Sequence, residues 1–402
     1  MNFLSIAAVL GFSLVSTVSA QSSPAAVAPA PAAADPIKVL VGRLGLDRYK
    51  ATIKGLTQFG DRRQGTDRNR AATDWIEAQL KAYGYTNTQR IKYDYFPTDP
   101  RRPSGPPIAN RPDAAQGGGR YRGVIAPTGV NNDPLRQTDV KLRVLNAQPG
   151  DVGLREEVYC TKVGTTHPEA MYIIGAHMDG HGWGEAANDD GSGTALVMEL
   201  ARVLASPDVK TEYSIRFVIW NNEETGLNGA YAYVAQRAAL QGREDPVGSG
   251  QYPEPRWLGM IQHDMMLFDH GLPGTDGTVA ATQRREADVN IEFQSHAHAA
   301  DGAMRLAFAF QAANEAYATD YPATVSPHMT NTDSTPFMDV VPSISLRENE
   351  RGREIGAGSD PHWHQPTDRF STFSDADFRL GLNAAQTTLG GLGRLVGLTV
   401  TP

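Results

Sequence analysis

Three short apolar runs alternate with helical segments in the middle of the chain, and this alternation limits the possible fold more than any other feature. The runs are MYIIGA (171–176), YSIRFVIW (213–220) and WLGMIQHDM (257–265), each rich in β-branched or aromatic residues and of strand length. Between them, GTALVMELARVLAS (193–206) and GAYAYVAQRAAL (229–240) have the apolar spacing of helices. This order of strands and helices indicates a largely parallel sheet with helices on its faces.

Further segments favour helices packed around this sheet. DRNRAATDWIEAQLKAYGY (67–85) has apolar side chains at helical spacing, and Gly84 is a plausible stop. Helices are also expected at 303–317 and 375–396, the second after Ser374 with an acidic residue three positions on, as in a capping box. These elements predict an α/β fold, a single domain with a mostly parallel central sheet flanked by helices.

The segment 96–150 differs from its surroundings because it is rich in proline, glycine and arginine. This composition predicts irregular structure, with short strands near 121–125 and 140–145. Loops shape ligand pockets, and this segment and 241–256 are expected to do so here.

The N-terminal residues predict an exported protein. Residues 1–20 form an apolar stretch ending in the small residues VSA, a pattern typical of a secretory signal peptide. An Ala/Pro-rich linker follows at 21–36, so the folded domain is expected to span 37–402. Since no later apolar run reaches transmembrane length, we expect a periplasmic or extracellular protein that is free of the membrane after cleavage.

Charge and cysteine content restrict the partners and the chemistry. The formal net charge is −8 and no long basic run is present, which argues against nucleic acid as a partner. The single cysteine, Cys160, excludes an intrachain disulfide and is expected to be a small buried residue. Any metal site must therefore use mainly histidine, aspartate and glutamate. The oligomeric state cannot be read from these features.

Side chains that bind metals follow each of the three predicted strands. Because ligands bind beyond the carboxyl ends of strands in open α/β sheets, we expect these side chains to meet at one edge. Imidazole with carboxylate and without thiolate suits zinc, manganese or cobalt better than calcium, and the acidic residues suffice for two ions. The residues are His177 and Asp179 after the first strand, Asp189 before the next helix, Glu223 and Glu224 after the second strand, and Asp264 at the end of the third.

Five short patterns also occur in a fixed order along the chain. They are HxD (177–179), NDDGSG (188–193), NNEExGLxGA (221–230), a strand-end Asp-Met (264–265) and WHQPTD (363–368). This order resembles the M28 family of zinc aminopeptidases, over roughly residues 55 to 395. The resemblance implies a zinc exopeptidase-like fold, two Zn²⁺ per chain and peptide substrates.

The resemblance implies a role for each matching residue. Glu223 would be the general base, taking the proton of a zinc-activated water as it attacks the scissile carbonyl and delivering it to the leaving amine. The Asp189–Asp190 peptide bond would be cis. The implied metal ligands are His177 and Asp264 for one zinc, Glu224 and His364 for the other, and Asp189 as a bridge between the two ions.

Neighbouring residues receive supporting or structural roles. Asp179 lies two residues after His177 and is expected to accept the other imidazole N–H and fix the ring. Asp190 is expected to cap the helix that begins near residue 192. His181 and Glu185 are expected to belong to the glycine-rich loop only.

Five other positions have no single assignment. His263 would point to the opposite face of its strand and is not assigned to the site. His362 is the alternative to His364 as a ligand. Trp363 stands where many relatives have tyrosine, whose hydroxyl can stabilise the oxyanion, and an indole N–H can also donate one hydrogen bond. Asp333 and Arg347 either contact the substrate or pair with each other.

The leading hypothesis is an exported dizinc metallo-exopeptidase that hydrolyses N-terminal residues from peptides. A carboxypeptidase is an alternative on the same scaffold, although it would usually recruit a basic cluster. A glutaminyl cyclase-type acyltransferase is another, and it resembles a one-zinc variant. A non-enzymatic binding module is the third, and such modules typically lose metal ligands.

Overall fold

The computed structural model describes five ranges of the chain: 34–96, 129–268, 289–329, 331–348 and 360–401. From Asp35 onward these residues form one compact unit. The predicted signal peptide, most of the predicted linker and the strand expected at 121–125 lie outside the described residues. None of the helices within these ranges is both long and apolar enough to cross a lipid bilayer.

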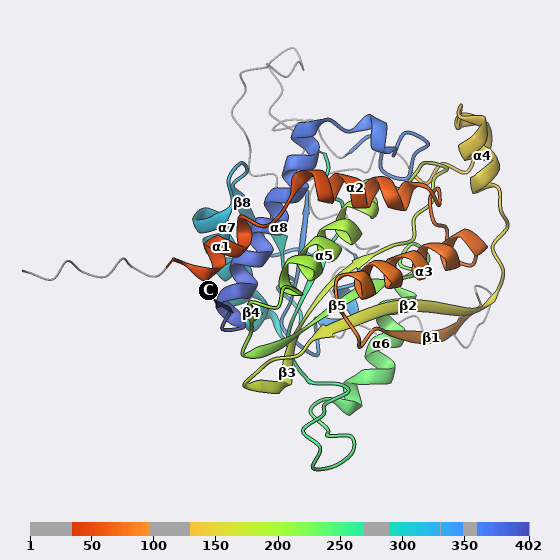
Figure 1. Cartoon of the computed structure of the whole chain (residues 1–402). Coiled ribbons are helices and arrows are strands. Elements are labelled where there is room, and N and C mark those ends of the chain that lie inside the picture. The colour runs from red at the N-terminus through yellow and green to blue at the C-terminus, as the bar shows by residue number, and fades with distance from the viewer. Residues whose placement is uncertain (1–33, 97–128, 269–288, 330, 349–359, 402) are drawn as a thin grey trace, which may run out of the picture. The chain divides into compact units, whose positions relative to one another are not determined.

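A mixed sheet with a parallel centre forms the middle of this unit (Figure 1). In order across the sheet, the strands are β1 (Gln89–Tyr95), β2 (Gly153–Lys162), β5 (Tyr213–Trp220), β3 (His167–His177), β6 (Arg256–His263), β9 (Ser343–Glu348), β7 (Val289–Glu292) and β8 (Ala323–Ser326). The central strands β5, β3, β6 and β9 run parallel, whereas β1–β2, β2–β5 and β7–β9 are antiparallel pairs. The sheet confirms the expected fold class.

The three apolar runs are β3, β5 and β6, and their side chains are buried on both faces of the sheet. On β3, the adjacent residues Ile173 and Ile174 point to opposite faces and both are fully buried. Gly175 next to them leaves room for Trp220 of β5, because a Cβ at this position would lie 2.2 Å from the indole nitrogen. Burial on both faces requires a layer of helices on each side.

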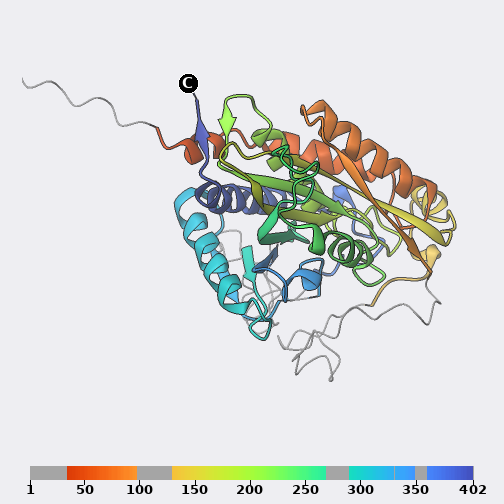
Figure 2. The same ribbon diagram turned by 90° about the horizontal axis from the view of Figure 1, so that it is seen from below.

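Helices supply these two layers. On one face lie α2 (Leu46–Thr57), α3 (Asp67–Ala82), α5 (Gly191–Leu204) and α8 (Asp375–Leu395), and on the other lies α6 (Asn228–Arg237). Figure 1 shows the sheet between the two layers, and Figure 2 views it from the α6 side. The described residues also include the α-helices α1 (Pro36–Val41), α4 (Val140–Asn146) and α7 (Ala300–Tyr317) and a two-stranded sheet of β4 (Val209–Lys210) and β10 (Thr399–Val400).

The predicted helix ends are confirmed at two places. After α3, Gly84 has φ +108°, a conformation that glycine adopts at little cost. Before α8, the Ser374 side chain accepts a hydrogen bond from the Asp377 amide, and the Asp377 carboxylate accepts one from the Ser374 amide. This reciprocal pair is the capping box that the sequence predicts.

The strand expected at 140–145 is wrong, because these residues form helix α4. The Asp139 carboxylate accepts hydrogen bonds from the amides of Lys141 and Leu142 and thereby starts the helix. Val140 and Val144, whose β-branched side chains favoured a strand, lie four residues apart and are largely exposed. A local cap and the burial of Leu142 outweigh the strand propensity here.

Candidate metal centre

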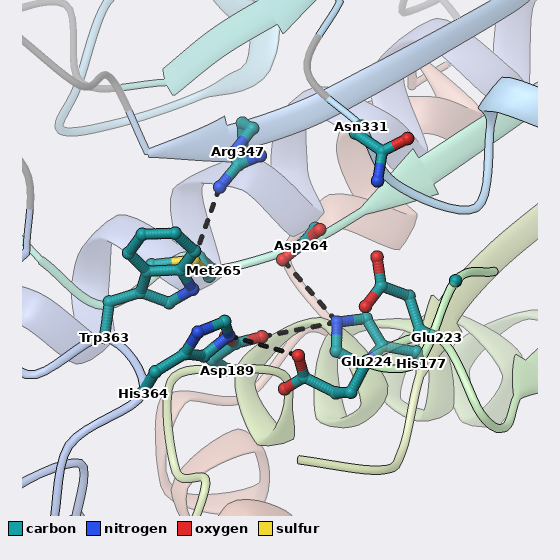
Figure 3. A pocket seen from close by; sticks show the side chains of 11 residues that line it. His177, Asp189, Glu223, Glu224, Asp264, Met265, Asn331, Arg347, Trp363 and His364 are labelled. Carbon is teal, nitrogen blue, oxygen red and sulfur yellow. Dashed lines mark hydrogen bonds and ion pairs between the residues drawn. The ribbon is translucent and has the colours of Figure 1, made fainter. Parts of the chain in front are cut away.

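The carboxyl ends of β3, β5 and β6 bring the predicted residues to one place. His177 is the last residue of β3 and pairs with Trp220, the last residue of β5. Asp264 follows β6 directly, and the loop after β5 carries Glu223 and Glu224. Figure 3 shows these side chains around one cavity together with Asp189 and His364.

A first group of possible metal ligands is almost fully buried. His177 Nε2 lies 3.3 Å from Asp189 Oδ1 and 3.7 Å from Asp264 Oδ1. The three ligand atoms lie within 4.8 Å of one another, so they can hold one ion. Burial acts to raise the pKa of Asp264, but the positive charges of Arg347 and His177 outweigh it and lower this pKa.

A second group lies beside the first and is more open. His364 Nε2 lies 2.9 Å from Asp189 Oδ2 and 3.1 Å from Glu224 Oε2. His181 Nε2 lies 3.0 Å from the same Glu224 oxygen, and these three residues can hold a second ion. His181, which was expected to be a loop residue only, therefore lies at the site.

Asp189 joins the two groups, because its carboxylate oxygens face different histidines. It precedes α5, and its peptide bond with Asp190 is cis, as the resemblance implies. Its backbone amide donates a 3.1 Å hydrogen bond to the Asp368 carboxylate. Burial acts to raise the pKa of Asp189, but hydrogen bonds with the two histidines hold it well below its usual range.

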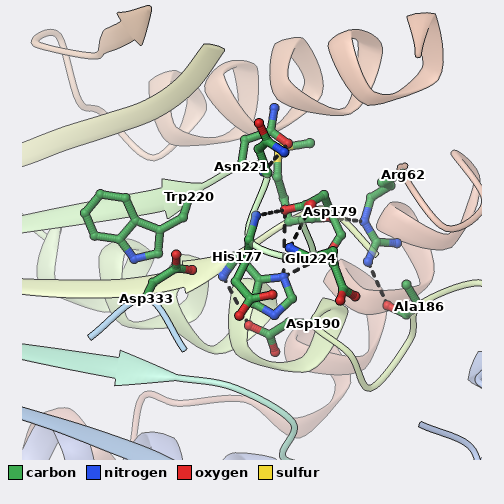
Figure 4. A network of polar contacts seen from close by, with 12 residues as sticks. Arg62, His177, Asp179, Ala186, Asp190, Trp220, Asn221, Glu224 and Asp333 are labelled. Atoms are coloured by element: carbon green, nitrogen blue, oxygen red, sulfur yellow. Dashed lines mark hydrogen bonds and ion pairs between the residues drawn. The ribbon is translucent and has the colours of Figure 1, made fainter. Parts of the chain in front are cut away.

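Asp179 has a different contact from the one expected. The His177 ring uses Nδ1 to reach the backbone oxygen of Asp179 at 2.9 Å, whereas the nearer Asp179 carboxylate oxygen lies 3.9 Å away. The carboxylate instead accepts hydrogen bonds from the backbone amides of Glu223 at 3.0 Å and Glu224 at 3.4 Å. The turn after β3 thus orients the imidazole with its backbone and the loop after β5 with its side chain (Figure 4).

The cavity between these groups has a volume of about 210 Å³. Glu223 lines it, and burial together with the carboxylates of Glu224 and Asp333 raises the pKa of Glu223 well above its usual range, while His177 opposes this effect. Besides Glu223, the lining residues are His177, Asp189, Glu224, Gly226, Asp264, Met265, Asn331, Arg347, Trp363 and His364.

Two residues near the site have structural contacts, as the sequence predicts. Asp190 caps α5 by accepting a 2.8 Å hydrogen bond from the Gly193 amide. His263 reaches the Gly175 backbone oxygen and the Thr388 hydroxyl, at 3.2 and 2.8 Å. Full burial lowers the pKa of His263 to about 4, so its ring is a neutral core group.

The contacts of His362, His364 and Glu185 distinguish their positions. His362 Nδ1 lies 2.9 Å from the Thr367 hydroxyl, and this histidine belongs to neither group of possible ligands. His364 belongs to the second group and lines the cavity. Glu185 accepts a 2.8 Å hydrogen bond from the Phe370 amide.

Arg347 and Asp333 lie in different surroundings. Arg347 lines the cavity and contacts the sulfur of Met265 at 3.3 Å. Asp333 is fully buried and lies 3.5 Å from Gln262 Nε2. Burial raises the pKa of Asp333 well above its usual range, while His177 opposes this effect.

A buried arginine that the sequence analysis missed holds the glycine-rich loop (Figure 4). The Arg62 guanidinium is fully buried and donates to the backbone oxygens of Met178, Glu185 and Ala186, at 2.6 to 2.9 Å. The sequence near Arg62 does not reveal this role, because these three acceptors are backbone oxygens more than 100 positions away; a fourth acceptor is the nearby Gly60 oxygen at 3.2 Å. The loop between His177 and Asp189 is therefore fixed from within.

Comparisons with known proteins agree with the fold and with the family resemblance. The model of Peptidase family M28 matches residues 157–386. Aminopeptidase YwaD of Bacillus subtilis is 44% identical over 68 residues, which are 17% of this chain and 14% of that protein. An aminopeptidase of Pseudomonas aeruginosa is 31% identical over 135 residues, 32% of this chain and 24% of that protein. The matches thus span less than a quarter of these relatives' lengths.

Solved structures share the fold at low sequence identity. An aminopeptidase from Aneurinibacillus sp. strain AM-1 superimposes with a TM-score of 0.54 at 19% identity, covering 91% of this chain and 98% of that one. A glutaminyl cyclase from Porphyromonas gingivalis also gives 0.54, at 17% identity, covering 88% and 99%. Because the family model spans more than half of the 402 residues, the chain belongs to peptidase family M28.

Proposed function

We propose that this protein is a zinc-dependent exopeptidase that removes N-terminal residues from peptides. The observation that carries the proposal is the position of Asp189, whose two oxygens face two separate groups of possible ligands. His177 and Asp264 would hold one zinc ion, Glu224 and His364 the other, and Asp189 would contact both.

The side chains present suit zinc. Both groups combine imidazole nitrogen with carboxylate oxygen, a ligand set that zinc accepts readily. Glu224 Oε1 is buried without a hydrogen-bond partner among the described residues, which is costly unless a cation or another group satisfies it. Zinc bound here would polarise the scissile carbonyl and make a water molecule easier to deprotonate.

Glu223 is proposed as the general base. Its carboxylate lines the cavity beside both groups, and its backbone is held by the Asp179 carboxylate. It would take a proton from the attacking water and deliver it to the leaving amine. Burial acts to raise its pKa, which favours proton uptake by this carboxylate.

The names of relatives favour cleavage at the N-terminus over the alternatives. Similar proteins are named aminopeptidases. Arg347 also lines the cavity and could hold a substrate carboxylate, so carboxypeptidase action is a second candidate. Glutaminyl cyclase action rests on the shared fold alone.

The test is a panel of substrates run with metal analysis on one sample. We expect release of the arylamine from aminoacyl-arylamides, none from N-acetylated versions, loss with chelator and recovery with zinc. Cleavage of N-blocked peptides with a free C-terminus would identify a carboxypeptidase. Cyclisation of N-terminal glutamine with about one zinc per chain would identify a cyclase.

A variant tests the role of Glu223. We expect Glu223→Gln to lower kcat by about 10²- to 10⁴-fold with zinc content unchanged, because the amide cannot accept the proton. Unchanged kcat in this variant would remove Glu223 from the mechanism. Glu315→Gln, at an exposed position of α7, is a matched control that we expect to leave kcat unchanged.

We further propose that the protein is exported, with 37–402 as the peptidase domain. The apolar stretch 1–20 and its small-residue end support this. Mass spectrometry of the protein from cell fractions should find an N-terminus near residue 21 outside the cytoplasm. An intact N-terminus in the cytoplasmic fraction alone would contradict export.

A further inference from the structure

The loop that carries His181 has an unusual backbone that presses it against the loop of His364. Gly182 has φ +92°, and a Cβ there would lie 2.3 Å from the His364 carbonyl carbon. Trp183 has φ +73°, in the left-handed region that residues other than glycine rarely adopt. The close approach of the two loops places His181 next to His364.

A side-chain amide and a backbone amide hold the two loops. Gln137 Nε2 donates to the backbone oxygens of Trp183 at 2.7 Å and Pro366 at 3.0 Å, one in each loop. The Asn131 backbone amide donates to the His364 backbone oxygen at 3.0 Å. These contacts hold the loop that carries His181 in one position. His181 is therefore not a freely moving surface histidine.

The imidazole of His181 faces the second group of ligands. Its ring lies edge-on to the His364 ring, with centroids 4.1 Å apart and planes at 89°. Its Nε2 lies 3.0 Å from Glu224 Oε2, yet this buried nitrogen has no hydrogen-bond partner among the described residues. The two atoms are close but are not aligned as donor and acceptor, which is the arrangement of two ligands directed at one ion.

We propose that His181 is a further ligand of the zinc ion held by Glu224 and His364. The inference rests on the proposed dizinc site and adds a third histidine to it. The ion at Glu224 would then have two imidazoles and two carboxylates, counting Asp189, whereas the ion at Asp264 would have one imidazole and two carboxylates. Because additional imidazole favours zinc over manganese or magnesium, the two positions would differ in metal preference.

Metal binding of the whole protein tests this without relying on activity. We would measure zinc affinity by competition with a chromophoric chelator for wild type, His181→Ala and His181→Gln, and record visible spectra of the cobalt-loaded forms. We expect both variants to bind one of the two ions more than about 100-fold more weakly, beyond the 10- to 100-fold typical of a hydrogen-bonding neighbour of a ligand. The cobalt absorption should change in the same variants.

His362→Ala is the matched control, because His362 lies in the same segment as His364 but outside both groups. It should leave both affinities and the cobalt spectrum unchanged. X-ray absorption of the wild-type dizinc protein needs no variant, and it should find three imidazoles over two zinc ions.

The outcomes separate the two proposals. A wild-type chain with two zinc ions but only two imidazoles, or His181 variants with wild-type zinc affinity, would overturn the role of His181 alone. A wild-type chain that binds fewer than two zinc ions would overturn the dizinc site and the role of His181 with it.

Discussion

The backbone amide of Glu223 donates a 3.0 Å hydrogen bond to the carboxylate of Asp179. This bond connects the turn after β3 with the loop after β5, and Glu224 donates a second, longer bond to the same carboxylate. The position of the proposed base therefore depends on a fully buried acid that does not line the cavity.

We expect Asp179→Ala to lower kcat by about 10- to 100-fold, because two backbone amides lose their acceptor and the Glu223–Glu224 loop shifts. Asp179→Asn should lower kcat less, since its side-chain amide oxygen can still accept a hydrogen bond. His177 bonds to the backbone oxygen of Asp179, so the ion at His177 should keep its affinity in both variants. Steady-state kinetics and zinc competition measure these effects. Equal loss at both ions, or wild-type kcat in Asp179→Ala, would contradict this role.

We expect Asp189→Asn to weaken zinc binding at both groups, because each carboxylate oxygen faces a different group. Asp264→Asn should weaken only the group of His177. Zinc at about 100 times its Kd should stabilise the wild-type fold by about 2.7 kcal/mol for each occupied site, and Asp189→Asn should lose most of this gain. Calorimetric melting with zinc or chelator measures the gain, with the exposed Asp94→Asn as a control.

We expect Trp363→Phe to lower kcat by about 10²-fold with little change in KM, if the indole N–H donates to the oxyanion. The ring lies 4.2 Å from the His364 ring, and Figure 3 shows it at the cavity. Phenylalanine keeps this packing and removes only the donor. Trp75→Phe, in α3, is the control. A wild-type kcat in Trp363→Phe would assign the indole to packing alone.

We expect acid-dependent stability from Glu77 on α3. Burial acts to raise its pKa, but bonds with Lys81, Arg90 and Thr88 lower it to about 2. The folded pKa is below the unfolded value, so the stabilisation is present above about pH 4.5 and is lost as pH falls toward 2. Allowing for solvent screening, Glu77→Gln should cost about 1–2 kcal/mol at pH 7.

Urea unfolding between pH 7 and pH 3, with chelator throughout so that metal loss does not contribute, measures this difference. Asp74→Asn is the control, because Asp74 pairs with the same Arg90 but its side chain is 68% exposed. It should cost less than Glu77→Gln at pH 7. A cost for Glu77→Gln that does not shrink with falling pH would exclude the carboxylate as its source.

Local patterns predicted the elements because their causes are local. The β-branched runs of β3 and β5 and the capping residues of α8 follow from side chains a few positions apart. The prediction of a strand at 140–145 was wrong because the Asp139 carboxylate caps a helix that begins at Val140. Propensity is a weak guide where the apolar side chains remain exposed.

The sequence by itself determined that carboxylates and imidazoles would gather at one edge of the sheet, because parallel strands bring their carboxyl ends together. Only the tertiary structure decided which atoms face one another. Three features depend on loops held by contacts between residues far apart in the chain. They are the direction of the Asp179 carboxylate, the hydrogen bonds from Arg62 to backbone oxygens, and the approach of His181 to Glu224. Such loops have no periodic pattern to read, since their paths follow from close packing at Gly182 and from hydrogen bonds to Gln137.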